Sequence, residues 1–160
     1  MTAPEPDPWA GSPVYAKYGE AAVAGFQAVP DLLLKHQDAL GLSPTNLVVL
    51  LNILMHWWYP DQKPFPRSTT IARRMGLSPR AVQRSLQKLQ RLGLLTRESS
   101  EDGPTYFDPE PLVTKLVVLA RDDIDYMVRR RGRQRREHRI GEGELGPNQL
   151  PRGRVPETPF

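Results

Sequence analysis

Residues 68–95 constrain the fold most, because several helix boundary signals recur there at close spacing. Ser78 stands where a helix N-cap is expected, Pro79 at the first helical position, and Gly93 just past the end. Gly76 comes shortly before this helix and permits the sharp turn that would follow a shorter helix starting at Ser68. The stretch therefore predicts two short helices joined by a tight turn, the helix-turn-helix plan.

The second of these helices, residues 79–92, has two chemically different sides. At roughly 100° per residue, its apolar side consists of Val82, Leu86, Leu89 and Leu92. Its opposite side consists of Arg80, Gln83, Arg84, Gln87, Lys88 and Arg91. Arg and Gln pair with guanine and adenine edges in the major groove, and Arg and Lys neutralise phosphates. An ordinary solvated helix can carry the same outer face, but its place in a helix-turn-helix favours DNA binding.

The sequence PRSTTIARRMGLSPRAVQRSLQKLQRLGLLTR resembles the winged helix-turn-helix domains of bacterial, phage and plasmid regulators and replication proteins. The resemblance extends over about residues 26–108 and rests on Ser68, Ile71, Ala72, Met75, Gly76, Ser78, Arg80, Val82, Gln83, Arg84, Leu86, Leu89, Gly93, Leu94 and Leu95. In that family the segment matching residues 78–92 is the recognition helix, supported by the segment matching residues 68–75. The resemblance implies a mainly α fold with a small β-hairpin wing, in a single domain with flexible N- and C-terminal arms.

The outward side of the recognition helix, together with the resemblance, defines the expected contacts with double-stranded DNA. Bases are expected to meet Arg80, Gln83, Arg84 and Gln87. Phosphates are expected to meet Ser68, Thr69, Arg73, Ser78, Lys88, Arg91, Arg97, Arg129, Arg130, Arg131 and Arg133.

A β-hairpin is expected to follow the recognition helix. Residues 94–98 alternate enough for a strand, SSEDGP forms a turn, and residues 105–107 return. Glu101 and Asp102 at its tip would be repelled by phosphates. Arg97 at the base of the wing is therefore its expected phosphate contact.

The segments before residue 68 should build the core. A short helix is expected over residues 29–40, followed by an apolar core helix that Ser43 caps and that runs to Trp58. His56 lies in this helix with no second His, Cys or carboxylate nearby, and is expected to be a packed or surface residue. Residues 63–66 form an extended connection that can supply a short edge strand.

The ends of the chain divide by composition into an arm, a helix and a tail. Residues 1–25 are rich in Pro and predict a disordered arm, and residues 129–160 predict a basic, Gly/Pro-rich flexible tail. Within that tail, the run RRRGRQRREHR is either a frayed helix extension or a disordered basic arm. Residues 109–128 predict a last helix whose apolar stripe packs either on its own domain or, as we prefer, on a second copy of the chain. The expected dimer interface consists of Leu112, Leu116, Leu119, Ile124 and Met127.

Charge is distributed unevenly along the chain, with net values of −3 over residues 1–60, +7 over 61–100, −5 over 101–128 and +5 over 129–160. The positive charge is thus concentrated on the expected DNA-reading segment and on the tail. There is no cysteine, no Gly-rich phosphate loop, no His cluster and no long apolar segment. We therefore expect no catalytic residue, no metal or cofactor site and no membrane span.

These features lead to a preferred function and to two alternatives. The preferred interpretation is a transcriptional regulator of a mobile element or plasmid, a sequence-specific protein that acts as a homodimer in the bacterial cytoplasm, associated with nucleoid or plasmid. The alternative is a plasmid or phage replication initiator that binds an origin and recruits replication machinery through its arms. A pure protein-interaction module ranks third, because it would leave the basic helix unexplained.

Overall fold

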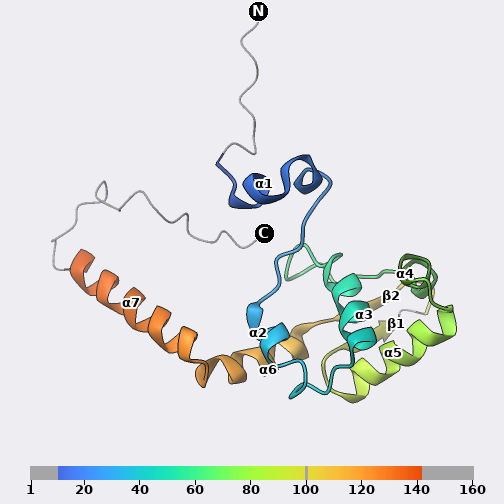
Figure 1. Ribbon diagram of the computed structural model, residues 1–160. Helices are drawn as coiled ribbons and strands as arrows, with labels where there is room; N and C mark the ends of the chain where they lie inside the picture. The colour runs from blue at the N-terminus through green and yellow to red at the C-terminus, as the bar shows by residue number, and fades with distance from the viewer. Residues whose placement is uncertain (1–10, 100, 142–160) are drawn as a thin grey trace, which may run out of the picture.

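The computed structural model describes residues 11–99 and 101–141 (Figure 1). Its elements are α1 (Pro13–Tyr18), the 3-10 helix η1 (Gly19–Ala22), α2 (Asp31–Lys35), α3 (Pro44–Leu54), α4 (Ser68–Met75), α5 (Pro79–Arg91), β1 (Thr96–Ser99), β2 (Thr105–Asp108), α6 (Glu110–Arg121) and α7 (Ile124–Gly141). The prediction of a mainly helical fold with one small hairpin is confirmed. The expectations for residues 1–10 and 142–160 lie outside the described residues.

Helices α4 and α5 form the expected pair joined by a tight turn. Gly76 ends α4 in the left-handed region, at φ 65°, where a side chain would be strained. The Ser78 hydroxyl then caps α5 by accepting a hydrogen bond from the Ala81 backbone N–H at 3.2 Å. At the other end of α5, the Lys115 ammonium group donates to the Leu92 carbonyl at 2.7 Å. Ser68 is the first residue of α4 and not its cap, since the cap position belongs to Arg67.

Helix α3 lies at the centre of the core. The Ser43 hydroxyl caps it as predicted, accepting from the Asn46 N–H at 3.2 Å, and Val49, Leu50 and Ile53 are fully buried. The helix ends at Leu54, earlier than predicted, and Trp58 is exposed in the connection that follows. Side chains from α2 to α6 and from the hairpin complete one apolar cluster: Leu33, Leu40, Leu42, Leu47, Val49, Leu50, Ile53, Ile71, Ala72, Val82, Leu86, Leu89, Leu94, Leu95, Phe107, Leu112 and Leu116.

A buried polar pair, which the sequence reasoning missed, joins α3 to α5 inside this core. The Ser85 hydroxyl donates to Asn46 Oδ1 at 2.8 Å, and both residues are less than a tenth exposed. Because a buried polar atom is costly without a partner, this bond favours one relative placement of the two helices.

The expected hairpin is present, and the chain that precedes α4 is fastened to it. Strands β1 and β2 pair antiparallel, with Arg97 opposite Phe107. The segment 63–66 forms no strand, but the Pro64 carbonyl accepts a hydrogen bond from the Phe107 N–H at 2.8 Å. Lys63 forms ion pairs with Glu98 at 2.7 Å and with Asp108 at 3.3 Å. These contacts hold the connection against the base of the hairpin.

The prediction of a single helix over residues 109–128 is wrong, because two helices, α6 and α7, cover this segment and are separated at residues 122–123. The Asp123 carboxylate accepts a hydrogen bond from the Tyr126 N–H at 3.0 Å and so caps a new helix. Lys35 of α2 forms ion pairs with Asp123 at 3.4 Å and with Asp125 at 2.6 Å. Helix α7 continues to Gly141, so the basic run begins as a helix extension and not as a flexible tail.

Most of the residues predicted to form the dimer interface pack against their own chain instead. Leu112 and Leu116 are buried in the core, and Leu119 packs against it. Ile124 and Met127 alone of the five proposed interface residues are exposed, at 73% and 41%. The other expectation, that these apolar residues pack on their own domain, is therefore correct for the three residues that belong to α6.

Two further expectations near the N-terminus differ from the structure. Residues 13–22 form α1 and η1, with the Ser12 hydroxyl capping α1 at Pro13, whereas a disordered arm was expected over residues 1–25. The helix predicted over residues 29–40 is shorter, because α2 ends at Lys35 and hydrogen-bonded turns follow. Over residues 11–99 and 101–141, no helix has both the length and the apolar character needed to cross a membrane.

Candidate nucleic-acid interface

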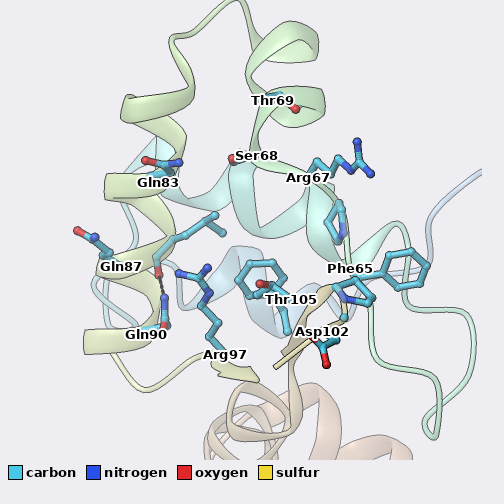
Figure 2. A pocket seen from close by; sticks show the side chains of 15 residues that line it. Phe65, Arg67, Ser68, Thr69, Gln83, Gln87, Gln90, Arg97, Asp102 and Thr105 are labelled. Atoms are coloured by element: carbon cyan, nitrogen blue, oxygen red, sulfur yellow. Dashed lines mark hydrogen bonds between the residues drawn. The ribbon is translucent and has the colours of Figure 1, made fainter. Parts of the chain in front are cut away.

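Helix α5, the start of α4 and the hairpin enclose a groove of about 880 Å³ (Figure 2). One wall consists of Gln83, Gln87 and Gln90 of α5. Arg97 of β1 lies between this wall and the opposite side, where the chain enters α4. Three elements that are separate in the sequence thus face one open space.

The exposed side of α5 is divided into two stripes. The three glutamines are spaced four and then three residues apart, so they share one line along the helix, and this line faces the groove. The cations form the second stripe, which does not line the groove and consists of Arg80, Arg84, Lys88 and Arg91. The amide and the basic side chains of α5 therefore face different directions.

The cations of α5 and of the hairpin are exposed and have no acidic partner within the described residues. Within residues 11–99 and 101–141, no ion pair is made by Arg80, Arg84, Lys88, Arg91 or Arg97. Lys35 and Lys63, by contrast, each bind two carboxylates. An exposed cation without a carboxylate partner is available to a phosphate, since no internal ion pair must first be broken.

The start of α4 adds polar groups to the groove. Ser68 and Thr69 line it at the N-terminus of the helix, where free backbone N–H groups and the helix dipole favour negative charge. Asp102 from the hairpin tip also lines the groove and contributes a negative charge. The groove is thus cationic at Arg67 and Arg97 and polar along α5 and α4, with one acidic residue, Asp102, in its lining.

The structure brings together five of the residues predicted to contact DNA, namely Gln83, Gln87, Ser68, Thr69 and Arg97. Ser78 uses its hydroxyl to cap α5, and Arg73 is exposed on α4.

The arginines of α7 lie apart from the groove. Arg129, Arg130, Arg131 and Arg133 are exposed on this helix, which extends away from α4 and α5 (Figure 1). Arg130 donates to the Tyr126 hydroxyl at 3.2 Å and lies 5.9 Å from the centre of its ring. A phosphate contact from α7 would therefore fall on a different part of the DNA from the contacts of α5.

The sequence reasoning did not assign Gln90, Arg67 or Phe65 to DNA contacts, although all three line the groove. Gln90 continues the line of Gln83 and Gln87 at helical spacing, so its position could have been predicted. Arg67 and Phe65 line the opposite side, where the contacts of residues 63 and 64 with the hairpin hold the chain. No local signal marks these two positions.

His56 lies outside the groove and faces Arg74 of α4. Its Nε2 is 3.2 Å from the Arg74 guanidinium, which can only donate, so this ring nitrogen accepts and the imidazole is neutral. Partial burial, and then the positive charge of Arg74, lower the pKa of His56 below its ordinary value. Across residues 11–99 and 101–141, no group of three or more His, Asp or Glu side chains is placed to hold a metal ion.

The solved structures that this chain is similar to include two from bacteria. The N-terminal domain of DnaD from Geobacillus kaustophilus is 27% identical, with a TM-score of 0.48, and the match covers 81% of this chain and 97% of that one. The YusO protein from Bacillus subtilis is 15% identical, with a TM-score of 0.37, over 83% of this chain and 96% of that one. No curated protein matches significantly.

The family model of the DnaD N-terminal domain matches residues 29–123, which include α2 to α6 and the whole groove. The chain therefore belongs to the DnaD N-terminal domain family, a replication-related and DNA-associated family.

Proposed function

We propose that this chain binds duplex DNA in a replication apparatus and that it does so as a winged helix-turn-helix. In this proposal α5 enters the major groove, the hairpin acts as the wing, and the start of α4 approaches the backbone. Membership of a replication-related family supports this alternative over the transcriptional regulator that we preferred from the sequence.

The observation that carries the proposal is the set of exposed, unpaired cations on α5 and β1. They lie in the segment with the highest net charge, +7 over residues 61–100. Each phosphate that such a cation neutralises releases condensed counterions from the duplex, which drives binding. A solvated surface helix can also carry cations, but four of them on one stripe without carboxylate partners give this helix a surface that suits phosphates.

The proposed role is recognition and recruitment, without catalysis. The chain marks a DNA site through α5, while surfaces on α6 and α7 remain free to contact replication machinery. Residues 101–128 carry a net charge of −5, so this part of the chain is repelled by phosphates and suited to contacts with other proteins.

Anisotropy titrations with a labelled duplex test DNA binding. Arg84→Ala and Lys88→Ala should each weaken binding, and should reduce the slope of log affinity against log salt by about 0.9 for each phosphate that is no longer neutralised. Lys17→Ala removes the same charge from α1 and is the matched control, with no expected change in slope. Equal slopes in all four proteins would contradict the proposal.

Footprinting on DNA around the gene for this chain separates replication from regulation. An array of direct repeats is the expected result for a protein that marks an origin. Protection of a promoter operator alone would instead support the transcriptional regulator.

A homodimer remains part of the proposal, with a smaller interface than the sequence reasoning assigned to it. Ile124, Met127 and Val128 of α7 are exposed apolar side chains that a second copy could cover. Analytical ultracentrifugation of the wild type should give a dimer that Ile124→Ser with Met127→Ser dissociates. A monomeric wild type at all concentrations would remove the homodimer from the proposal.

A further inference from the structure

Among the exposed side chains of α5, the groove assigns base reading to amides, because Gln83 and Gln87 face the space that α4, α5 and the hairpin share and the arginines of this helix do not. A duplex that touches all three elements at once must lie across this groove. The stripe that then faces its major groove carries Gln83 and Gln87. The cationic stripe lies to one side of this line, toward a flanking phosphate backbone.

We propose that Gln83 and Gln87 read adenines, and that Arg80, Arg84, Lys88 and Arg91 contact phosphates. This inference rests on the proposed function, and it reassigns Arg80 and Arg84 from bases to phosphates. A glutamine amide matches adenine in the major groove, since its oxygen accepts from N6–H and its NH₂ group donates to N7. An arginine in the same position would instead select guanine.

Gln83 and Gln87 are distinguished from Gln90 by their hydrogen bonds. The Gln90 Nε2 already donates to the Leu86 carbonyl at 3.1 Å. Within residues 11–99 and 101–141, the amides of Gln83 and Gln87 make no hydrogen bond, and both side chains are exposed. Both amide atoms of these two residues are therefore free for a bidentate pair.

The spacing along α5 sets the spacing of the bases. Residues four apart on a helix are separated by about 6 Å along its axis, at 1.5 Å per residue. Successive bases of a strand are about 3.4 Å apart, so two base steps span about 6.8 Å. The two glutamines should therefore meet adenines about two steps apart.

Selection from a pool of random-sequence duplexes of one length tests this inference. The wild type should enrich two adenines about two steps apart, and Gln83→Ala or Gln87→Ala should each abolish the enrichment of one of them. In competition titrations, each variant should reduce the preference for the selected duplex over a G·C-substituted one by about tenfold. The salt slope should stay unchanged, because neither glutamine is charged.

A duplex with a deaza-adenine that lacks the N7 acceptor separates major-groove reading from a preference for A·T shape. It should bind the wild type more weakly than the unmodified duplex, although its minor groove is unaltered. Gln62→Ala, which removes an exposed amide outside the groove, is the matched control, and its preference should equal that of the wild type.

The possible results separate this inference from the proposed function. DNA binding without adenine enrichment would overturn the inference and leave the proposed function in place. An equal loss of preference in Gln62→Ala would also overturn the assignment to Gln83 and Gln87. No binding to any duplex would overturn the proposed function itself, and the inference with it.

Discussion

Removing the Ser85 hydroxyl should destabilise the fold, although it deletes only one atom. This hydroxyl donates to Asn46 Oδ1 at 2.8 Å, and both residues are buried between α3 and α5. Ser85→Ala leaves the Asn46 oxygen without its donor in a place that water hardly reaches. An unsatisfied buried acceptor costs about 1–3 kcal/mol, so we expect the free energy of unfolding to fall by that amount.

Substitution of the other partner, Asn46→Leu, should lower the free energy of unfolding by less than Ser85→Ala does. A serine hydroxyl inside a helix can turn and donate to the carbonyl four residues earlier, which for Ser85 is Ala81. The double variant removes both polar groups and should be about as stable as Asn46→Leu alone. The two changes should therefore not be additive, with a coupling equal to the cost of Ser85→Ala alone, about 1–3 kcal/mol.

Urea unfolding followed by circular dichroism measures this cycle. The midpoints should shift while the slope m stays constant, because the surface exposed on unfolding hardly changes. Ser99→Ala is the control, since Ser99 makes only an exposed 3.4 Å contact with Thr105, and its effect should be within about 0.5 kcal/mol. An unchanged midpoint for Ser85→Ala, or full additivity in the double variant, would refute this account of the buried pair.

Three further predictions address packing, pH and the basic helix. Leu89→Ala empties a fully buried site and should destabilise by about 2–5 kcal/mol in thermal melts, whereas Leu34→Ala, at a residue 53% exposed, should have little effect. The Tyr126 N–H, and then the Lys35 ammonium group, hold the pKa of Asp123 below its ordinary value. This stabilisation is present above the ordinary pKa and is lost as pH falls through the lower folded value, so the urea midpoint should drop below about pH 4, and drop less in Asp123→Asn. Removing residues 129–160 should flatten the salt slope of DNA binding by about 0.9 for each phosphate that this segment neutralises, with sequence preference retained, and an unchanged slope would show that this segment does not contact DNA.

The parts of the fold that the sequence predicted well depend on contacts between near neighbours in the chain. Ser43 and Ser78 cap the helices that they were expected to cap, because the capping bond reaches only three residues ahead. Gly76 permits the turn because its backbone adopts a positive φ angle, which depends on this residue alone. The hairpin was likewise predicted at the turn that joins its strands, although β1 begins at Thr96 and not at residue 94, and all of its residues are exposed.

The predictions that failed concern residues whose structure depends on distant partners. Nothing near Asp123 in the sequence indicates that Lys35 of α2 will form an ion pair with it at the bend between α6 and α7. The apolar stripe of Leu112 and Leu116 was correctly predicted to be buried, but periodicity cannot tell whether the same chain or a second copy buries it. In the structure, α6 packs against α2 of the same chain.

The same limit applies to the candidate site. The outward-facing residues of α5 could be predicted, but not which of them line the groove. Helical periodicity separated the outer side of α5 from its buried side, so Arg80, Gln83, Arg84 and Gln87 were all predicted to face outward. It could not show which part of that outer side faces the hairpin, because this direction depends on how β1 and β2 pack beside α5. Once the hairpin is in place, Gln83 and Gln87 face the groove, whereas Arg80 and Arg84 do not line it. A sequence pattern can therefore separate the outer side of a helix from its buried side, whereas dividing that outer side between the groove and its flank requires the neighbouring elements.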